Sequence, residues 1–379
     1  MQTLKVDEHN TITIYLPDGY QQDKNNYPVI YVMDAQRYFL HAIAYQKTLV
    51  WQDKAPAFIV VGINTEDINR RELLDTKSST FIATMQNDIV KYVDLHYRTN
   101  DLRMFFAWEM AGGFALELLA TQPELFDAYF LASATFITES RLNLIKELFA
   151  KKPNVSGFLY YTLGAVESWS FESHQLLSDI LNASATSAFK WKYNLSEHDD
   201  HYTTPLGTFN KGLAYYFQDY PPLRFYSLEE FKNFGGMKAL KKHYENRGMH
   251  YQISTDIHKQ TKHYLINQAI NENNFVIFKE LVHEFDDFIE KNNYRLAFLT
   301  KIGSFFVANG ASDRAISLYK TGILENPDSD ELNVELGDIY LRQNKFKEAK
   351  THYEKAMSLV KDSDAEKYKL YKSRLINVN

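Results

Sequence analysis

Short and almost uninterrupted apolar runs alternate with stretches of helical periodicity in the first half of the chain. The apolar runs lie at residues 29–33, 58–63, 104–107, 129–132 and 158–163. Their continuous apolar character is typical of parallel strands that are buried on both faces. Between them, residues 81–93 and 113–119 carry apolar side chains at helical spacing. The alternation predicts a doubly wound α/β sheet.

The strand pattern ends before the chain does. Residues 189–195 alternate apolar and polar side chains, which predicts a last, half-exposed strand ahead of a loop with His198 and His201. After about residue 220 no strand signal remains, and the first helical stretch, 228–246, is rich in Lys, Glu and aromatic residues.

A period of 34 residues appears near the C-terminus. Small and aromatic residues recur at this distance: Gly303, Phe306, Ala315 and Tyr319 return as Gly337, Tyr340, Ala349 and Tyr353. The spacing resembles the tetratricopeptide repeat, in which small residues let two antiparallel helices approach. Residues 258–287 fit a degenerate third unit, and an ordinary pair of helical hairpins is the alternative. We therefore expect a sheet domain at 1–220, a helical connector at 221–290 and repeats at 291–379.

Bulk properties exclude several classes of function. A chain of 379 residues favours two domains, and a net charge of −6 with both signs mixed indicates neither nucleic-acid nor polybasic membrane binding. No apolar run reaches the ~20 residues that a membrane helix needs, and residues 1–8 are too polar for a signal peptide. The absence of cysteine excludes disulfides, thiolate ligands and a cysteine nucleophile. It leaves the compartment open between cytoplasm and periplasm.

The most informative segment is 105–116, which leads from an apolar strand through small residues into a helix. This is the context of a nucleophile elbow, whose usual pattern is G-x-S-x-G with serine at the strained apex. Here Glu109 stands at the apex and Ala107 and Ala111 at the flanking positions. The expected nucleophile is absent.

Several ordered motifs carry a family resemblance. The segments TITIYLPDGY (11–20), YPVIYVMDAQ (27–36) and VGIN (61–64), the last followed by Arg70 and Arg71, are similar to the opening strands of one group of esterases. YRTN (97–100) then precedes the elbow at that group's usual distance. Residues 11 to about 220 resemble the esterase D and enterochelin-esterase branch of the α/β-hydrolases, and the resemblance implies that fold.

The resemblance also assigns site residues. DDHYTTPL (199–206) is similar to the family's histidine loop, which makes His201 the expected catalytic histidine. Glu167, after the strand at 158–163, matches the family's acid, with a solvated loop glutamate as the alternative. The oxyanion hole would use the backbone amides of Gln36 and Met110. Ala35 replaces a family glycine, and if that turn needs positive φ, alanine costs about 1 kcal/mol.

Glu109 admits three roles in such a site. As a nucleophile toward an ester it would form a mixed anhydride, and the adduct would collapse backwards because a carboxylate leaves more readily than an alkoxide. With a raised pKa it could act as a general base. Alternatively its carboxylate fills the oxyanion hole, accepting the amides of Gln36 and Met110 at a helix N-terminus, with a salt bridge to protonated His201.

These arguments favour an esterase-like protein that has lost ordinary serine-esterase chemistry and binds a small ligand or a partner. The alternative is an enzyme that uses Glu109 and His201 as acid and base, or Glu109 as a carboxylate nucleophile, on an ester, siderophore-like or acyl-peptide-like substrate. An engineered Ser→Glu change is a third reading. Asp34, Trp108 and Trp169 are the expected pocket residues. We expect no cofactor and no metal, because His198 and His201 beside two aspartates lack a further ligand. The repeats either present a groove to a peptide or protein partner or pack on the first domain.

Overall fold

The computed structural model describes residues 2–5, 11–66, 69–285, 296–376 and 378. Its first part contains an eight-stranded sheet with the order β1-β2-β4-β3-β5-β6-β7-β8. The strands are β1 (Gln2–Lys5), β2 (Thr11–Tyr15), β3 (Tyr27–Met33), β4 (Ile59–Asn64), β5 (Thr99–Trp108), β6 (Ala128–Ala132), β7 (Gly157–Gly164) and β8 (Phe189–Ser196). The β1–β2 and β2–β4 pairs are antiparallel, whereas β4, β3, β5, β6, β7 and β8 pair in parallel.

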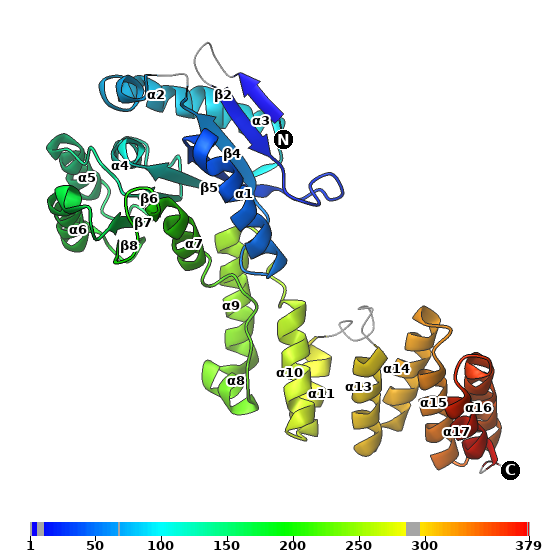
Figure 1. The fold of residues 1–379 in the computed structure, drawn as a ribbon. Helices are drawn as coiled ribbons and strands as arrows, with labels where there is room; N and C mark the ends of the chain where they lie inside the picture. Colours follow the sequence, from blue (N-terminus) through cyan, green and yellow to red (C-terminus); the bar gives the residue numbers. More distant parts are fainter. Residues whose placement is uncertain (1, 6–10, 67–68, 286–295, 377, 379) are drawn as a thin grey trace. The chain divides into compact units, whose positions relative to one another are not determined.

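The five continuous apolar runs form the centre of this sheet. Every residue of β3 and of β6 is buried, as the apolar character of these runs predicts for strands covered on both faces. β8 is the last strand of the sheet and alternates buried, partly buried and exposed residues. The predicted doubly wound α/β sheet is confirmed (Figure 1).

Helices cover both faces of the sheet because successive strand side chains point to opposite sides. On one face Val29 and Tyr31 pack in a core with Phe114 of α4. On the other face Ile30 and Val32 pack with Phe209 of α7. The first layer holds α2 (Ser78–Thr84), α3 (Lys91–His96), α4 (Met110–Thr121), α5 (Glu139–Lys151) and α6 (Phe171–Ser184), and the second holds α1 (Ala35–Trp51) and α7 (Thr204–Tyr216).

The chain divides into two compact units. Unit 1 comprises residues 1–221 and 245–255, and unit 2 comprises residues 222–244 and 256–379. The short return of residues 245–255 to unit 1 is not indicated by the sequence pattern, which placed this segment in the connector. Tyr251 explains it, because its buried ring belongs to the α7 side of the unit 1 core and its hydroxyl donates to Tyr216 O at 3.1 Å.

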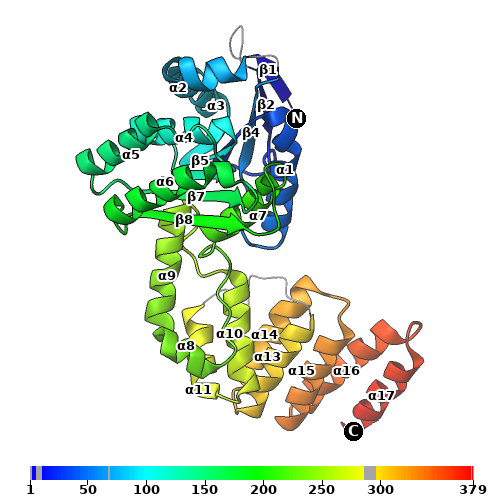
Figure 2. The same ribbon diagram turned by 60° about the vertical axis from the view of Figure 1, so that its left-hand side comes forward.

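The regular secondary structure in the described residues of unit 2 is helical (Figure 2), and the last residues of α9, 245–251, belong to unit 1. The predicted helical stretch 228–246 is broken at Gly235, whose φ of 109° ends one helix and allows the next to start in a new direction. The helices are α8 (Leu228–Phe234), α9 (Gly236–Tyr251), α10 (Lys259–Asn271), α11 (Phe275–Glu284), α13 (Leu296–Ala308), α14 (Ser312–Glu325), α15 (Asp330–Arg342), α16 (Phe346–Val360) and α17 (Ala365–Ile376).

The repeat signature marks the closest helix approaches of unit 2. A Cβ added at Gly303 would lie 2.2 Å from the ring of Tyr319, and one at Gly337 would lie 2.6 Å from the ring of Tyr353. Glycine on one helix therefore makes room for the tyrosine of the next, as the period of 34 residues indicates. α10 and α11 occupy the place of the expected degenerate third unit, whose last residues, 286–287, lie outside the described residues.

Candidate functional site

Glu109 lies at the sharp turn between β5 and α4. Its φ of 57° and ψ of −124° are unfavourable for a residue with a side chain, so the surroundings must hold the turn in place. Glu109 N donates to Ala132 O at 3.1 Å, and Glu109 O accepts from Gly112 N at 2.9 Å and Thr135 N at 3.0 Å. These three bonds fix the backbone on both sides of the strained residue.

Small residues after Glu109 allow the turn to pack. A Cβ at Gly112 would lie 2.5 Å from the Cβ of Ala134, and one at Gly113 would lie 2.5 Å from the carbonyl oxygens of Thr135 and Phe136. Ala107 and Ala111 are fully buried. The small-residue pattern around the apex therefore reflects the close approach of α4 to the loop that follows β6.

The Glu109 carboxylate forms an ion pair with Arg70. The same guanidinium donates from Nε and Nη2 to the two carboxylate oxygens of Asp34, at 2.8 and 2.9 Å, and from Nη2 to Trp108 O at 3.0 Å. Asp34 is buried and also accepts a 2.5 Å bond from Thr65 Oγ1. Arg70 thus lies between two carboxylates, one buried and one facing the cleft.

The charge of Arg70 is stabilised despite its partial burial. Desolvation lowers its pKa, but the hydrogen bonds and negative charge of Asp34, with the charge of Glu109, outweigh it and raise the pKa. Burial, followed by the charge of Asp34, also raises the pKa of the neighbouring Tyr38. Both groups keep their protons at neutral pH.

Glu109 does not fill the expected oxyanion hole. Its side chain accepts no capping hydrogen bond at the start of α4, where Met110 is the first helical residue. Gln36 is the second residue of α1, so both amides occupy positions that lack a partner within the helix. Among the described residues the ion-pair partner of Glu109 is Arg70, not His201.

The turn before α1 also differs from expectation. The left-handed residue is Asp34, with φ of 54° and ψ of 49°, whereas Ala35 is helical and buried. Alanine at position 35 therefore carries no positive-φ cost. Its Cβ packs over Gly62, where an added Cβ would approach within 2.7 Å.

His201 and Glu167 form a close pair. His201 Nδ1 lies 2.6 Å from Glu167 Oε1, and the other carboxylate oxygen accepts from Ser133 Oγ at 2.6 Å and Gly164 N at 2.7 Å. Glu167 is completely buried, which excludes the alternative of a solvated loop glutamate. A carboxylate held in this way fixes the orientation of the histidine ring.

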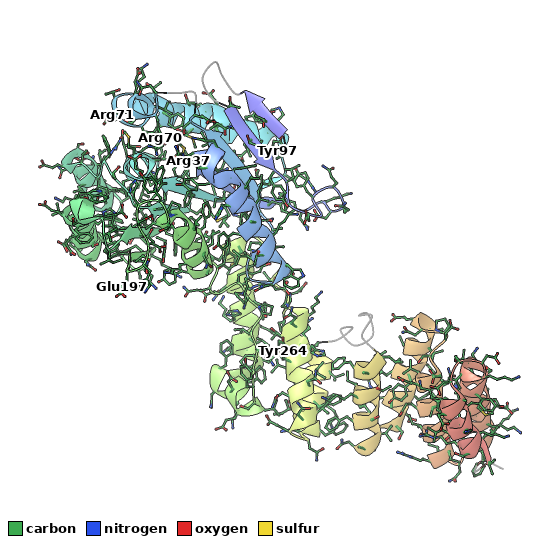
Figure 3. All side chains as sticks on the ribbon, viewed as in Figure 1. Arg37, Arg70, Arg71, Tyr97, Glu197 and Tyr264 are labelled. Carbon is green, nitrogen blue, oxygen red and sulfur yellow. The ribbon has the colours of Figure 1, made fainter. Side chains whose placement is uncertain are left out.

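Trp108 contacts both Arg70 and His201. Its Nε1 donates to His201 O at 2.8 Å, and the centres of the two rings are 5.1 Å apart. Arg37 and Arg70 both lie over the indole ring, at 5.6 and 5.7 Å from its centre. In Figure 3 the labelled side chains of Arg37, Arg70 and Arg71 follow one another along this part of unit 1.

A cleft of about 560 Å³ opens beside Glu109. Its lining contains three carboxylates, two arginines, one aromatic ring and two neutral polar side chains: Asp34, Glu66, Glu109, Arg37, Arg70, Trp108, Gln36 and Thr65. Asp34 and Trp108 are therefore at the expected place. Trp169 is not part of this lining and is 68% exposed.

The sequence did not indicate the site roles of Arg70, Ser133 and Thr65. Arg70 lies 39 positions before Glu109 and entered only as part of a motif. Ser133 and Thr65, which support Glu167 and Asp34, follow β6 and β4 directly; polar residues at the carboxyl ends of parallel strands were the available signal. His198 is exposed, and no group of three or more His, Asp or Glu side chains in the described residues is arranged to hold a metal ion.

Comparison with known proteins agrees with the fold. A family model described as "Putative esterase" matches residues 4–207, and a tetratricopeptide-repeat model matches residues 306–371. Among the described residues no helix has the length and apolar character required to span a membrane. No curated protein sequence matches the chain.

Solved structures show the same relationship at low sequence identity. An IroE-like serine hydrolase from Shewanella oneidensis is 18% identical, with a TM-score of 0.56 over 75% of this chain and 99% of its own. An uncharacterised protein from Capnocytophaga ochracea is 16% identical, with a TM-score of 0.51 over 100% of this chain and 98% of its own. The enterobactin esterase from Shigella flexneri is 16% identical, with a TM-score of 0.46 over 57% of this chain and 59% of its own. At these identities the likeness concerns the fold alone.

Proposed function

We propose that this chain, which belongs to the esterase family matched at residues 4–207, has lost ordinary serine-esterase chemistry and binds a small ligand in the cleft beside Glu109. One observation carries the proposal. The residue at the strained strand-to-helix turn has a carboxylate that is ion-paired with Arg70, where acyl transfer needs a hydroxyl group next to the histidine.

The chemistry of a carboxylate supports the loss of acyl transfer. Attack by Glu109 on an ester would give a tetrahedral adduct whose best leaving group is the carboxylate itself, since carboxylic acids have a pKa of about 4. The adduct would therefore return to substrate. The ion pair with Arg70 further reduces the nucleophilicity of the carboxylate, because it stabilises the negative charge before attack.

His201, Glu109 and Trp108 offer contacts for a small ligand. His201, oriented by Glu167, would present Nε2 as an acceptor when neutral. Glu109 offers a second acceptor in the cleft; His201 is not part of the cleft lining, but its ring lies 5.1 Å from that of Trp108, which is. A ligand with hydroxyl or amine donors on a flat body would meet both acceptors while its ring or chain contacts the indole.

The first test is turnover of p-nitrophenyl acetate and p-nitrophenyl butyrate by the full chain. We expect the wild type and His201→Ala to release nitrophenol at the same rate, because no serine is available for acylation. A burst or steady release that disappears in His201→Ala would overturn the proposal.

A second candidate function rests on the intact His201–Glu167 pair, which lies 2.6 Å apart and needs only a reacting partner. In this version Glu109 and His201 act as acid and base on an ester of siderophore-like or acyl-peptide-like character. Incubating the wild type with such esters and following their mass would reveal it. Loss of the conversion in Glu109→Gln, with binding retained, would favour this candidate over ligand binding alone.

A further inference from the structure

Six exposed apolar side chains lie at the end of β8 and in the segments that directly follow β7 and β8. We call this set the β7–β8 rim, and its members are Val166, Trp169, Phe171, Leu195, Tyr202 and Leu206. Their exposed fractions run from 37% for Phe171 to 72% for Tyr202. Single exposed apolar residues are ordinary on a protein surface, whereas a group that includes a tryptophan and a tyrosine is typical of an interaction site.

The two loops that carry most of the rim are held together. The loops that follow β7 and β8 are joined by the 2.9 Å bond from Ala165 N to Ser196 O and by the 2.6 Å contact between Glu167 and His201. Tyr202 packs edge-on against His201, with ring centres 5.3 Å apart, and also lies 6.2 Å from the ring of Trp108. The Glu167–His201 pair, of which Glu167 is buried, thus connects the two loops that carry the exposed side chains.

Within the two chain segments that carry the rim the formal charge has one sign, whereas Lys190, Lys192 and Lys211 lie just beyond these segments in the sequence. Residues 165–189 and 195–210 contain no lysine and no arginine, but they contain the exposed carboxylates of Glu172, Glu197 and Asp200. Within the described part of the chain neither Glu172 nor Glu197 has an ion-pair partner. Figure 3 shows Glu197 well separated from the labelled arginines of the same unit.

We propose that the β7–β8 rim binds a basic segment of a partner protein that carries aromatic or aliphatic side chains. Apolar side chains supply the contact area, and the surrounding carboxylates select positive charge. An anionic membrane surface would be repelled by the same carboxylates, and a symmetric second copy would bring Glu172 and Glu197 against identical charges. The proposal is independent of the fate of Glu109, because no residue of the cleft is required for it.

A synthetic peptide provides the probe. We would measure fluorescence anisotropy of a labelled twelve-residue peptide that alternates lysine with leucine and tryptophan, titrated with the full-length protein at about 50 and 500 mM salt. A second peptide with glutamate in place of lysine tests the charge requirement. The wild type should bind the lysine peptide, more weakly at high salt, and should not bind the glutamate peptide.

Two double variants test the apolar contacts and the negative charge of the rim separately. Trp169→Ala/Tyr202→Ala should weaken binding by about tenfold or more at both salt concentrations, since aromatic anchors dominate such contacts. Glu172→Lys/Glu197→Lys should weaken it by a similar factor at low salt and reduce the salt dependence. Controls are Trp51→Ala, which removes a tryptophan that is 83% exposed on α1, and Glu348→Lys/Glu354→Lys, which makes the same charge change at two exposed positions of unit 2.

The outcomes separate clearly. Weakening in both rim variants, with the two controls binding like the wild type and all proteins showing the same urea midpoint, supports the proposal. Equal binding by the rim variants and their controls overturns it. Sedimentation that reveals a wild-type dimer, lost in the same rim variants, would also overturn it, because a second copy would then cover this surface.

Discussion

At the scale of single residues, Arg70 organises the candidate site. It connects the buried Asp34 with the cleft-facing Glu109 and with the backbone of Trp108. A serine at position 109 would leave one end of this guanidinium without its carboxylate. The Glu109 side chain is therefore part of a charge network and not an isolated replacement.

The network makes a prediction about stability. Arg70→Leu leaves the Asp34 carboxylate, which is 1% exposed, without its charged partner, and we expect a loss of about 3 kcal/mol in the free energy of unfolding of unit 1. Arg71→Leu removes the adjacent exposed arginine and should change it by no more than about 0.5 kcal/mol. Urea unfolding followed by tryptophan fluorescence measures this, because Trp51, Trp108, Trp169 and Trp191 all lie in unit 1. Equal losses in the two variants would contradict the role of Arg70.

A second residue-scale prediction concerns pH. Burial lowers the pKa of His174, whose ring is fully buried beside the stacked rings of Tyr161 and Tyr193, so the folded protein keeps it neutral. Below its unfolded pKa of about 6.5 the unfolded chain gains a proton that the folded chain refuses. Stability is therefore complete above pH ~6.5 and falls as the pH drops toward the folded pKa, by at most about 1.4 kcal/mol per pH unit from this group.

Urea midpoints at about pH 7.5 and 5.5 test this dependence. His174→Phe keeps a flat ring but cannot take up a proton, so its loss between the two pH values should be smaller than that of the wild type. His198→Gln, at an exposed position, should lose as much as the wild type. Identical losses in His174→Phe and the wild type would assign the acid sensitivity to other groups.

At the scale of elements, the sequence predicts what depends on local pattern. The central strands follow from continuous apolar runs, and β8 follows from its alternation. The turn at Glu109 follows from small residues between a strand and a helix. The pairing of Arg70 with Glu109 could not be predicted, since it joins residues 39 positions apart through folding of the whole sheet.

The sequence pattern also does not predict two helix boundaries, one before α1 and one at Gly235. The left-handed position before α1 falls on Asp34 instead of Ala35, which is already the first residue of the helix. Gly235 divides the expected helical stretch 228–246 because its φ of 109° is incompatible with a continuous helix. In both places a single backbone angle decides the boundary, and periodicity does not report it.

The repeats give an element-scale prediction. Gly303→Ala adds a methyl group 2.2 Å from the Tyr319 ring, so α13 and α14 must separate, and we expect a destabilisation of about 1–3 kcal/mol. Helix propensity alone would favour alanine by about 1 kcal/mol. Hydrogen exchange of the α13 and α14 amides is the measurement, with exposed Ser317→Ala on α14 as the neutral control. Slower exchange in Gly303→Ala would show that the close packing is absent.

At the scale of the whole molecule, the set of residues that form unit 1 differs most from the domain boundaries predicted from the sequence. Residues 245–255 lie beyond the expected end at residue 220, yet they supply Tyr251 to the core and Arg247, whose Nε donates to Tyr220 O at 2.6 Å. Long-range packing of this kind leaves no periodic signal in the sequence.

A truncation pair tests this composition. The chain that ends at residue 255 should unfold cooperatively, whereas the chain that ends at residue 221 should be less stable by about 3 kcal/mol or more, because it exposes the aromatic surface that Tyr251 covers. Urea unfolding with tryptophan fluorescence is again suitable. Equal stability of the two fragments would show that residues 245–255 are dispensable for unit 1.

We propose that the His201–Glu167 pair persists in a site whose Glu109 carboxylate cannot transfer acyl groups. Hydrolysis of p-nitrophenyl butyrate by the wild type, Glu109→Ser and Glu109→Ser/His201→Ala tests it most directly. We predict no His201-dependent rate in the wild type, a weak rate in Glu109→Ser, and its loss in the double variant, because His201 and Glu167 are already paired. The gain should be small, since misplacement by ~1 Å can cost about 10²-fold. A wild type that hydrolyses the ester through His201, and loses this activity in Glu109→Ser, would contradict the account.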